Sequence, residues 1–363
     1  MSEPISSVDE SPANIIIFVA DGMGFSHLSA ARAVLAGVGG EVVWDRFPTT
    51  GWHYAHPAAG FLIDSAASAT ALATGVPTRP GAVGVDLEGT ELPNLFERAV
   101  ELGYRTGIVT DSYVWDATPA AFVGHVDSRE DAATILAQLA SSSLELLVGE
   151  LEDVGEEEVP DWASSLQVLE SRFRVFGPDP QSTETFLKEV GKGPPIAAIF
   201  EEDQVTDLRS NPTFPDLVAA GLDHLASDPQ RPFVLLVESE EPDSASHKAD
   251  FNRLLRGMEA IARALEIVLE FSAENGETLV VFTSDHETGG LSLSVEDDSN
   301  SALLPLWATS DHSGVSVPLF AIGPGAEQFG GIHATWELGR LLEGMLRRAP
   351  GSSGEGDRGR FRV

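Results

Sequence analysis

Acidic and histidine side chains follow three apolar runs that lie far apart in the chain. The runs and the residues that come after them are 14–20 with Asp21, 233–237 with Glu238, Asp243 and His247, and 278–283 with Asp285 and His286. A single acid after a strand is commonly a turn former or a helix cap. Ligands of open α/β sheets bind beyond the carboxyl ends of the strands, so three such ends can converge on one point. The pattern therefore predicts a metal site.

The residue types at these ends suit oxygen and nitrogen ligation of divalent cations. Asp and His are ligands for Zn²⁺ with an open coordination position, and an additional Glu and a Thr hydroxyl suit the harder Mg²⁺. Asp243 and His247 are four residues apart, which places both on one face of a helix. Asp285 and His286 are adjacent and can bind one ion only from an irregular loop. His312 lies in a loop of small polar residues, whereas packing is the favoured role for five other histidines: His27, His53, His56, His224 and His333.

The stretch LIDSAASATALATG (62–75) is an alanine-rich helix with several hydroxyls in its first turns. One interpretation is that Asp64 or Ser65 caps the helix. The other is that the Ser65 hydroxyl lies at the positive end of the helix because it attacks an anionic group. The stretch by itself leaves both open.

Strand-like runs alternate with helical patterns along the chain, which predicts an α/β fold. Five apolar runs read as strands buried on both faces (14–20, 106–110, 233–237, 278–283 and 318–322), and the clearest helix covers 252–274. We expect one large, mostly parallel central sheet flanked by helices on both faces, in a single domain over 14–349. Residues 149–215 read as an acidic, irregular excursion from that sheet. Residues 1–13 read as a flexible N-terminus and 350–363 as a disordered tail.

Composition narrows the function classes. The 363 residues carry a net charge of −35, which disfavours nucleic acid or an anionic membrane as a partner. Adaptation to high salt is one hypothesis for this acidity, and a merely acidic soluble protein is the other. The absence of cysteine excludes disulfides and thiolate metal sites. No apolar run is long enough to span a membrane, and no signal peptide is visible at the N-terminus, so the compartment stays open.

Seven stretches in this order resemble the alkaline phosphatase family: VADGMG, DSAASATALATG, DATPAAFVGHVDSR, VESEEPDSASH, TSDHETGG, TSDHSG and VPLFAIGPGAE. The resemblance covers residues 14 to about 342 and is weakest over 149–215. It implies a phosphomonoesterase of broad specificity that releases phosphate through a covalent phosphoserine intermediate. It also implies two zinc ions, one magnesium ion, a homodimer and a periplasmic or secreted location.

The resemblance also assigns roles to individual residues. Ser65 matches the nucleophile, Arg129 matches the guanidinium that binds two phosphate oxygens, and Asp116 matches an aspartate near the magnesium site. The metal ligands it implies are Asp243, His247 and His312 for the first zinc, Asp21, Asp285 and His286 for the second, and Asp21, Thr118 and Glu238 for magnesium. With these roles, Ser68 and Thr70 read as structural.

Some positions depart from the family pattern, and rival functions follow from related enzymes. Ser244 stands where relatives carry a lysine or histidine that reaches toward phosphate, which puts the third metal in doubt and predicts weaker product binding. A sulfatase is disfavoured because its Cys or Ser nucleophile would be followed by x-Pro-x-Arg, whereas Ser65 is followed by Ala-Ala-Ser-Ala. Diesterases typically lack an arginine at the position of Arg129, so Arg129 favours monoesters, and promiscuous diester cleavage is the nearest alternative. A non-catalytic metal-binding scaffold is the remaining one.

Overall fold

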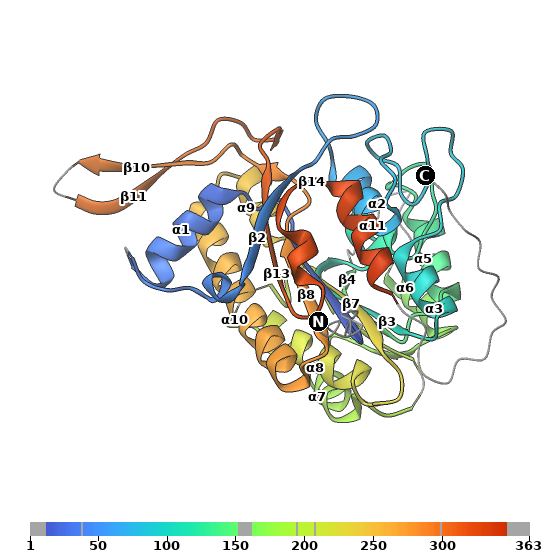
Figure 1. Ribbon diagram of the computed structural model, residues 1–363. Helices are drawn as coiled ribbons and strands as arrows, with labels where there is room; N and C mark the ends of the chain where they lie inside the picture. Colours follow the sequence, from blue (N-terminus) through green and yellow to red (C-terminus); the bar gives the residue numbers. More distant parts are fainter. Residues whose placement is uncertain are drawn as a thin grey trace, which may run out of the picture.

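The computed structural model describes residues 12–37, 39–151, 162–193, 195–206, 208–297 and 300–346. Within this part of the chain, ten strands form one central sheet (Figure 1). Their order is β14 (Gly331–Ala334), β2 (Thr49–Tyr54), β13 (Val317–Ile322), β8 (Thr278–Thr283), β1 (Asn14–Ala20), β7 (Phe233–Ser239), β3 (Arg105–Tyr113), β4 (Leu146–Leu151), β6 (Ile196–Glu201) and β5 (Arg174–Phe176). All neighbouring pairs are parallel except the two that include β13. The predicted fold class is confirmed.

Strand β1 supplies side chains to two separate hydrophobic cores, one on each face of the sheet. Ile15, Ile17 and Val19 belong to one core, and Ile16 and Phe18 to the other, as the two-residue period of a strand requires. The helices that cover the first face are α2 (Ser65–Thr74), α3 (Leu95–Glu101), α4 (Ala117–Ala121), α5 (Ala132–Ser141), α6 (Trp162–Glu170) and α11 (Thr335–Met345). Those that cover the second are α1 (Phe25–Leu35), α7 (Pro180–Glu189), α8 (Phe214–Leu225), α9 (Glu241–His247) and α10 (Phe251–Asn275).

Helix α10 agrees with the helix expected over 252–274 to within one residue at each end. Its apolar stripe is buried in the second core, with Leu254, Met258 and Leu265 fully covered. The Asp250 side chain caps the first turn by accepting a hydrogen bond from the Arg253 N–H, and Gly276 ends the helix in the left-handed conformation. The local signals at both ends therefore decide its length.

The irregular excursion expected at 149–215 is not what the described part of this segment forms. It contains β5, β6, α6, α7 and the start of α8, and the strands β4, β6 and β5 extend the main sheet to its edge. The acidic composition suggested irregular structure, but it arises where helices α6 and α7 turn polar residues to solvent. The short strand β6 is almost wholly buried. Residues 152–161 lie outside the described residues, as do 1–11 and the expected tail at 350–363.

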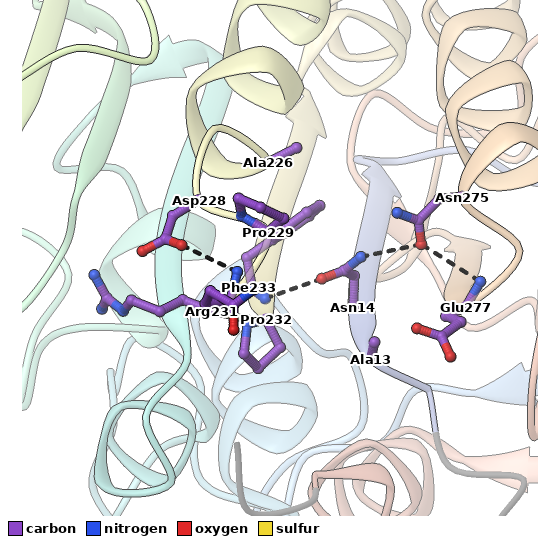
Figure 2. Close-up of a pocket in the computed structure, with 11 residues that line it drawn as sticks. Ala13, Asn14, Ala226, Asp228, Pro229, Arg231, Pro232, Phe233, Asn275 and Glu277 are labelled. Atoms are coloured by element: carbon purple, nitrogen blue, oxygen red, sulfur yellow. Dashed lines mark hydrogen bonds between the residues drawn. The ribbon is translucent and has the colours of Figure 1, made fainter. Parts of the chain in front are cut away.

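A cavity of about 230 Å³ opens at the amino ends of β1 and β7 (Figure 2). The Asn14 side chain bonds to the Asn275 side chain and accepts from the Phe233 N–H. Asp228 in turn accepts from the Gln230 N–H. These polar groups are occupied with one another and lie at the edge of the sheet opposite to Asp21.

Among the described residues, no helix is long and apolar enough to cross a bilayer.

We predict that His224 makes the fold sensitive to acid. Its ring is buried at the end of α8, and burial together with the nearby Arg105 lowers its pKa from 6.5 to about 4. The unfolded chain takes up a proton below pH 6.5 and the folded chain does not until pH 4. Stability is therefore lost as the pH falls through this window, by up to about 1.4 kcal/mol per pH unit.

The test is urea unfolding of the metal-free protein at several pH values between 4 and 8, with His224→Asn as the comparison. The Asn side chain can still accept from the Gly191 N–H, which the ring Nδ1 accepts at 3.0 Å. We expect the free energy of unfolding of His224→Asn to depend less steeply on pH than that of the wild type, by up to about 1.4 kcal/mol per pH unit between pH 4 and 6.5. Parallel curves for the two proteins would contradict the assignment.

Candidate metal centre

The central strands β8, β1 and β7 bring three acid-bearing ends together. Val19 in β1 pairs with Thr283 of β8 on one side and with Glu238 of β7 on the other. The chain leaves β1 at Asp21 and leaves β8 at Asp285, so these carboxylates lie at the same edge of the sheet. The convergence expected from the strand ends is present in the structure.

The first group of potential ligands consists of Asp243, His247 and His312. One ligand atom from each lies within 4.8 Å of the others. His247 Nε2 is 3.2 Å from Asp243 Oδ2, and His312 Nε2 is 3.9 Å from Asp243 Oδ1. Asp243 and His247 occupy one face of α9, as their spacing predicts.

The second group consists of Asp21, Asp285 and His286, all buried. His286 Nε2 lies 3.5 Å from Asp21 Oδ1 and 3.2 Å from Asp285 Oδ2. Asp285 and His286 lie in the irregular segment after β8, which is the condition for neighbouring residues to approach one ion. The rings of His286 and His312 stack with centroids 3.6 Å apart, so the two groups are adjacent.

A short antiparallel pairing delivers His312 to this position. Strand β12 (His312–Ser313) pairs with β9 (Glu287–Thr288), so that His312 lies opposite Thr288. Thr288 also donates a short hydrogen bond to Asp243 Oδ1, which links the two groups. Sequence reasoning did not single out Thr288, although it directly follows the TSDHE stretch that contains two of the predicted ligands.

Hydrogen bonds fix which ring nitrogen two of the histidines present. His247 Nδ1 donates to the Ser310 carbonyl at 2.7 Å, and His312 Nδ1 donates to the Ile63 carbonyl at 2.8 Å. Each Nε2 then faces Asp243 and is the ring nitrogen left to bind a metal ion. Metal-binding histidines characteristically donate their second nitrogen in this way.

Ser65 is the first residue of α2 and faces the second group. Its Oγ lies 3.2 Å from His286 Nε2. Asp64 is the N-cap and accepts from the Ala67 N–H at 3.0 Å, so the two interpretations of this stretch are compatible. Ser68 donates to the Asp285 carbonyl at 2.8 Å and Thr70 donates to the Ala82 carbonyl at 3.1 Å, as expected of structural hydroxyls.

Arg129 lies beside the start of α2 and is held by two carboxylates. Its guanidinium donates to Asp116 Oδ1 at 2.6 Å and approaches Asp64 Oδ2 at 3.9 Å. Its backbone N–H donates to the Gly81 carbonyl, and the Gly81 N–H donates to Asp64 Oδ2. Burial lowers the pKa of Arg129, but Asp116 and Asp64 outweigh it, so the net pKa is raised and the group stays charged.

A third group of oxygen atoms lies beside Asp21. Thr118 is in α4, and Glu238 is fully buried with its Oε2 accepting from the Thr110 hydroxyl at 2.7 Å. Among the described residues, four buried ligand-type atoms at this edge of the sheet make no hydrogen bond: Asp21 Oδ1, Thr118 Oγ1, Glu238 Oε1 and Asp285 Oδ2. Buried oxygens left unpaired are costly unless a cation takes the place of a donor. The donor set therefore fits divalent metal ions.

The pKa shifts of these residues in the metal-free protein also indicate a cation site. Burial raises the pKa of Asp21 well above 3.8, and the neighbouring Asp285, Asp243 and Glu238 raise it further. Burial likewise raises the pKa of Glu238. His247 is different, because the Asp243 carboxylate raises its pKa to about 9. A cation would replace that proton and favour the ionised carboxylates.

The histidines expected to pack do not join either group. His27 and His53 are fully buried, and burial lowers the pKa of each to about 4. His27 bonds to Ser246, and His53 bonds to the hydroxyls of Thr335 and Thr283. The hydrogen bonds of these two rings hold together helices and strands that carry the predicted metal ligands.

The chain is similar to known proteins of one family over most of its length. The model of the alkaline phosphatase family matches residues 12–150 and 196–306. The alkaline phosphatase of Escherichia coli is 28% identical over 94% of this chain and 87% of that protein. A cold-active alkaline phosphatase from Shewanella has a TM-score of 0.80 at 26% identity over 92% of this chain and 100% of that one. A TAB5 alkaline phosphatase variant with Mg bound in its M3 site has a TM-score of 0.80 at 23% identity, over 92% and 98% of the two chains.

Repulsion within the centre predicts a reversal of stability on metal binding. Burial and the neighbouring carboxylates raise the pKa of Asp21, so at pH 8 the folded metal-free protein is destabilised either by the buried charge or by the proton that neutralises it. The free energy of unfolding of Asp21→Asn, measured with urea, should therefore exceed that of the wild type by about 1–3 kcal/mol. With saturating Zn²⁺ the wild type should be the more stable of the two. Asp223→Asn, the same change at an exposed site, should shift neither. If the wild type were more stable in both states, repulsion at Asp21 would not be the governing effect.

Proposed function

The chain belongs to the alkaline phosphatase family, and from this premise we propose that it hydrolyses phosphate monoesters through a covalent phosphoserine at Ser65, with two zinc ions and one magnesium ion. At the level of the family, the protein is a metal-dependent phosphatase, and the family acts on phosphate monoesters. The intermediate, the metal stoichiometry and a broad monoester specificity are the proposal. Diester cleavage on the same site is the alternative.

The observation that carries the proposal is the position of the Ser65 hydroxyl. It lies at the first residue of α2 and 3.2 Å from His286 Nε2, beside two adjacent groups of Asp and His ligand atoms. The free N–H groups and the dipole at a helix start favour a bound phosphate. The Ser65 hydroxyl is thus positioned to attack the phosphorus atom of a phosphate group whose oxygens the start of the helix helps to bind.

The transfer has two halves. Ser65 Oγ attacks phosphorus and the substrate's alcohol leaves, which forms the phosphoserine. Water then attacks the phosphoserine, releasing inorganic phosphate and returning the serine. Arg129 presents a planar guanidinium that can bind two phosphate oxygens at once, which a lysine cannot do. Asp116 orients that guanidinium through its 2.6 Å hydrogen bond. Such binding contacts only the phosphate, which suits broad monoester specificity.

The ligand sets proposed from the sequence fit the donor atoms described above. Asp243, His247 and His312 would hold one zinc, and Asp21, Asp285 and His286 the other. Asp21, Thr118 and Glu238 would hold magnesium. When bound, these ions would lower the pKa of a hydroxyl and neutralise the charge that develops on the attacking and leaving oxygens.

We predict that a chromogenic phosphate monoester is hydrolysed with Zn²⁺ and Mg²⁺ present, assayed at both low and molar salt. EDTA should abolish turnover and the two metals should restore it. Ser65→Ala should lower kcat by at least about a thousandfold because no other hydroxyl takes over the attack. Ser29→Ala, at an exposed serine of α1, should retain wild-type rates.

Trapping separates the covalent route from direct attack by water. Acid quenching of the reaction should yield a phosphorylated peptide that contains Ser65, detected by mass spectrometry. Full activity in Ser65→Ala would contradict the phosphoserine route, and turnover that survives EDTA would contradict the metal requirement. No turnover in any salt would reopen the diester and non-enzymatic alternatives.

Ser244 generates a second prediction, on product inhibition. Its hydroxyl donates to Glu240 at 2.7 Å and offers no positive charge to phosphate. We expect Ser244→Lys to lower the inhibition constant of phosphate about fivefold relative to wild type. Ser244→Met has similar length without the charge and should not. Equal constants for wild type and Ser244→Lys would reject the idea that the missing cation weakens product binding.

A further inference from the structure

A buried hydroxyl connects two carboxylates beneath Arg129. Ser112, near the end of β3, is 1% exposed. Its Oγ lies 2.9 Å from Asp116 Oδ2 and 2.6 Å from Glu240 Oε2. A serine hydroxyl has one proton, so it is shared between the two acceptors in a three-centre arrangement. The side chain of Glu240 thereby reaches Asp116 through a single intervening group.

Asp116 is the residue that sets the direction of the Arg129 guanidinium. Its Oδ1 accepts from Arg129 Nη2 and from the Ala117 N–H, each at 2.6 Å. Its other oxygen has Ser112 as its partner. A rotation of the Asp116 carboxylate would redirect the guanidinium. The Ser112 hydrogen bond opposes this rotation at Oδ2, and the Ala117 N–H does so at Oδ1.

Glu240 is itself held from both sides. Its Oε1 accepts from the Ser244 hydroxyl at 2.7 Å, and its backbone N–H donates to Asp111 Oδ1 at 2.7 Å. Asp111 is 2% exposed, and its second oxygen accepts from the Ser239 hydroxyl. The turn between β7 and α9 is thus fixed by a buried carboxylate, and the Glu240 side chain is directed inward toward Ser112.

We propose that Glu240 is a positioning residue for phosphate binding, acting through Ser112 and Asp116 on the Arg129 guanidinium. The proposal rests on the proposed function in that it takes Arg129 to bind phosphate. When ionised, Glu240 repels an anionic ligand, so a purely electrostatic effect of its removal on phosphate binding would have the opposite sign. Removing that charge alone would strengthen phosphate binding, whereas removing the relay weakens it.

The experiment measures binding of inorganic phosphate to the metal-loaded protein by calorimetry, alongside its inhibition constant and KM in turnover. Glu240→Ala should weaken phosphate binding about tenfold and raise KM, with a smaller effect on kcat. Glu240→Gln should stay within about twofold of wild type, because its amide can accept from Ser112 and donate to the Ser244 oxygen. Ser112→Ala should reproduce the loss from another point of the relay.

Two controls separate this role from simpler ones. Glu202→Ala removes an exposed acid that lines a cavity of about 50 Å³ together with Glu240 and Ser244, and it should leave phosphate binding unchanged or strengthen it. In an Arg129→Ala background, Glu240→Ala should have no further effect on phosphate binding. Bound zinc and magnesium, measured by atomic absorption, should be the same in wild type and Glu240→Ala.

The proposal is overturned if Glu240→Ala binds phosphate as tightly as wild type or more tightly, if its effect persists without Arg129, or if it loses metal. A wild-type protein that binds phosphate but hydrolyses no monoester would reject the proposed function and leave the relay standing. A wild type that binds no phosphate would reject both.

Discussion

The register of β1 between β7 and β8 is the constraint on which the rest of the structure depends, because it brings mutually repelling buried carboxylates together at the carboxyl edge of the sheet. Val19 pairs with neighbours on both sides, and this register forces Asp21, Asp285 and Glu238 together. A chain free to relax would separate them. The apolar residues of β1 point alternately into two cores, and the packing on both faces prevents that separation. The sheet therefore holds in place a cluster that is unfavourable until a cation binds.

Small residues allow the helices to approach this cluster closely enough to complete it. Gly22 follows Asp21 in a left-handed conformation, and a Cβ there would lie 2.7 Å from the Asp243 Cα. This contact places α9, with Asp243 and His247, against the end of β1. On the other face, a Cβ at Gly339 of α11 would lie 2.6 Å from the carbonyls of Ala71 and Leu72 in α2. The alanines of α2 thus pack beneath the site with α11 directly behind them.

The sequence was sufficient for five of the ten strands in the described sheet and for the long helix α10, because each depends on a local pattern. It was also sufficient for the convergence of the ligand groups, because the carboxyl ends of parallel strands meet at one edge of a sheet. It was not sufficient for the sheet's far edge, where β6 and β5 add to β4 although the segment reads as acidic and irregular. The relay through Ser112 was also missed. Its contact with Glu240 depends on the register of β3 against β7, in which Thr110 pairs with Glu238, and that register is not encoded by either segment alone.

The balance of charge also sets the order in which ligands can bind. The protein carries a net charge of −35, and the metal-free site gathers the carboxyl groups of Asp21, Asp243, Asp285 and Glu238 near the guanidinium of Arg129, which is already paired with Asp116. A phosphate anion approaching this arrangement meets net repulsion despite the favourable end of α2. Cations bound at the ligand groups would reverse the sign of the local electric field. They would then supply most of the attraction for phosphate, and the Arg129 guanidinium would mainly orient it. For the proposed function we therefore expect metal binding to precede phosphate binding, so that the geometry that Asp116 and its partners impose on Arg129 takes effect once the cations are in place.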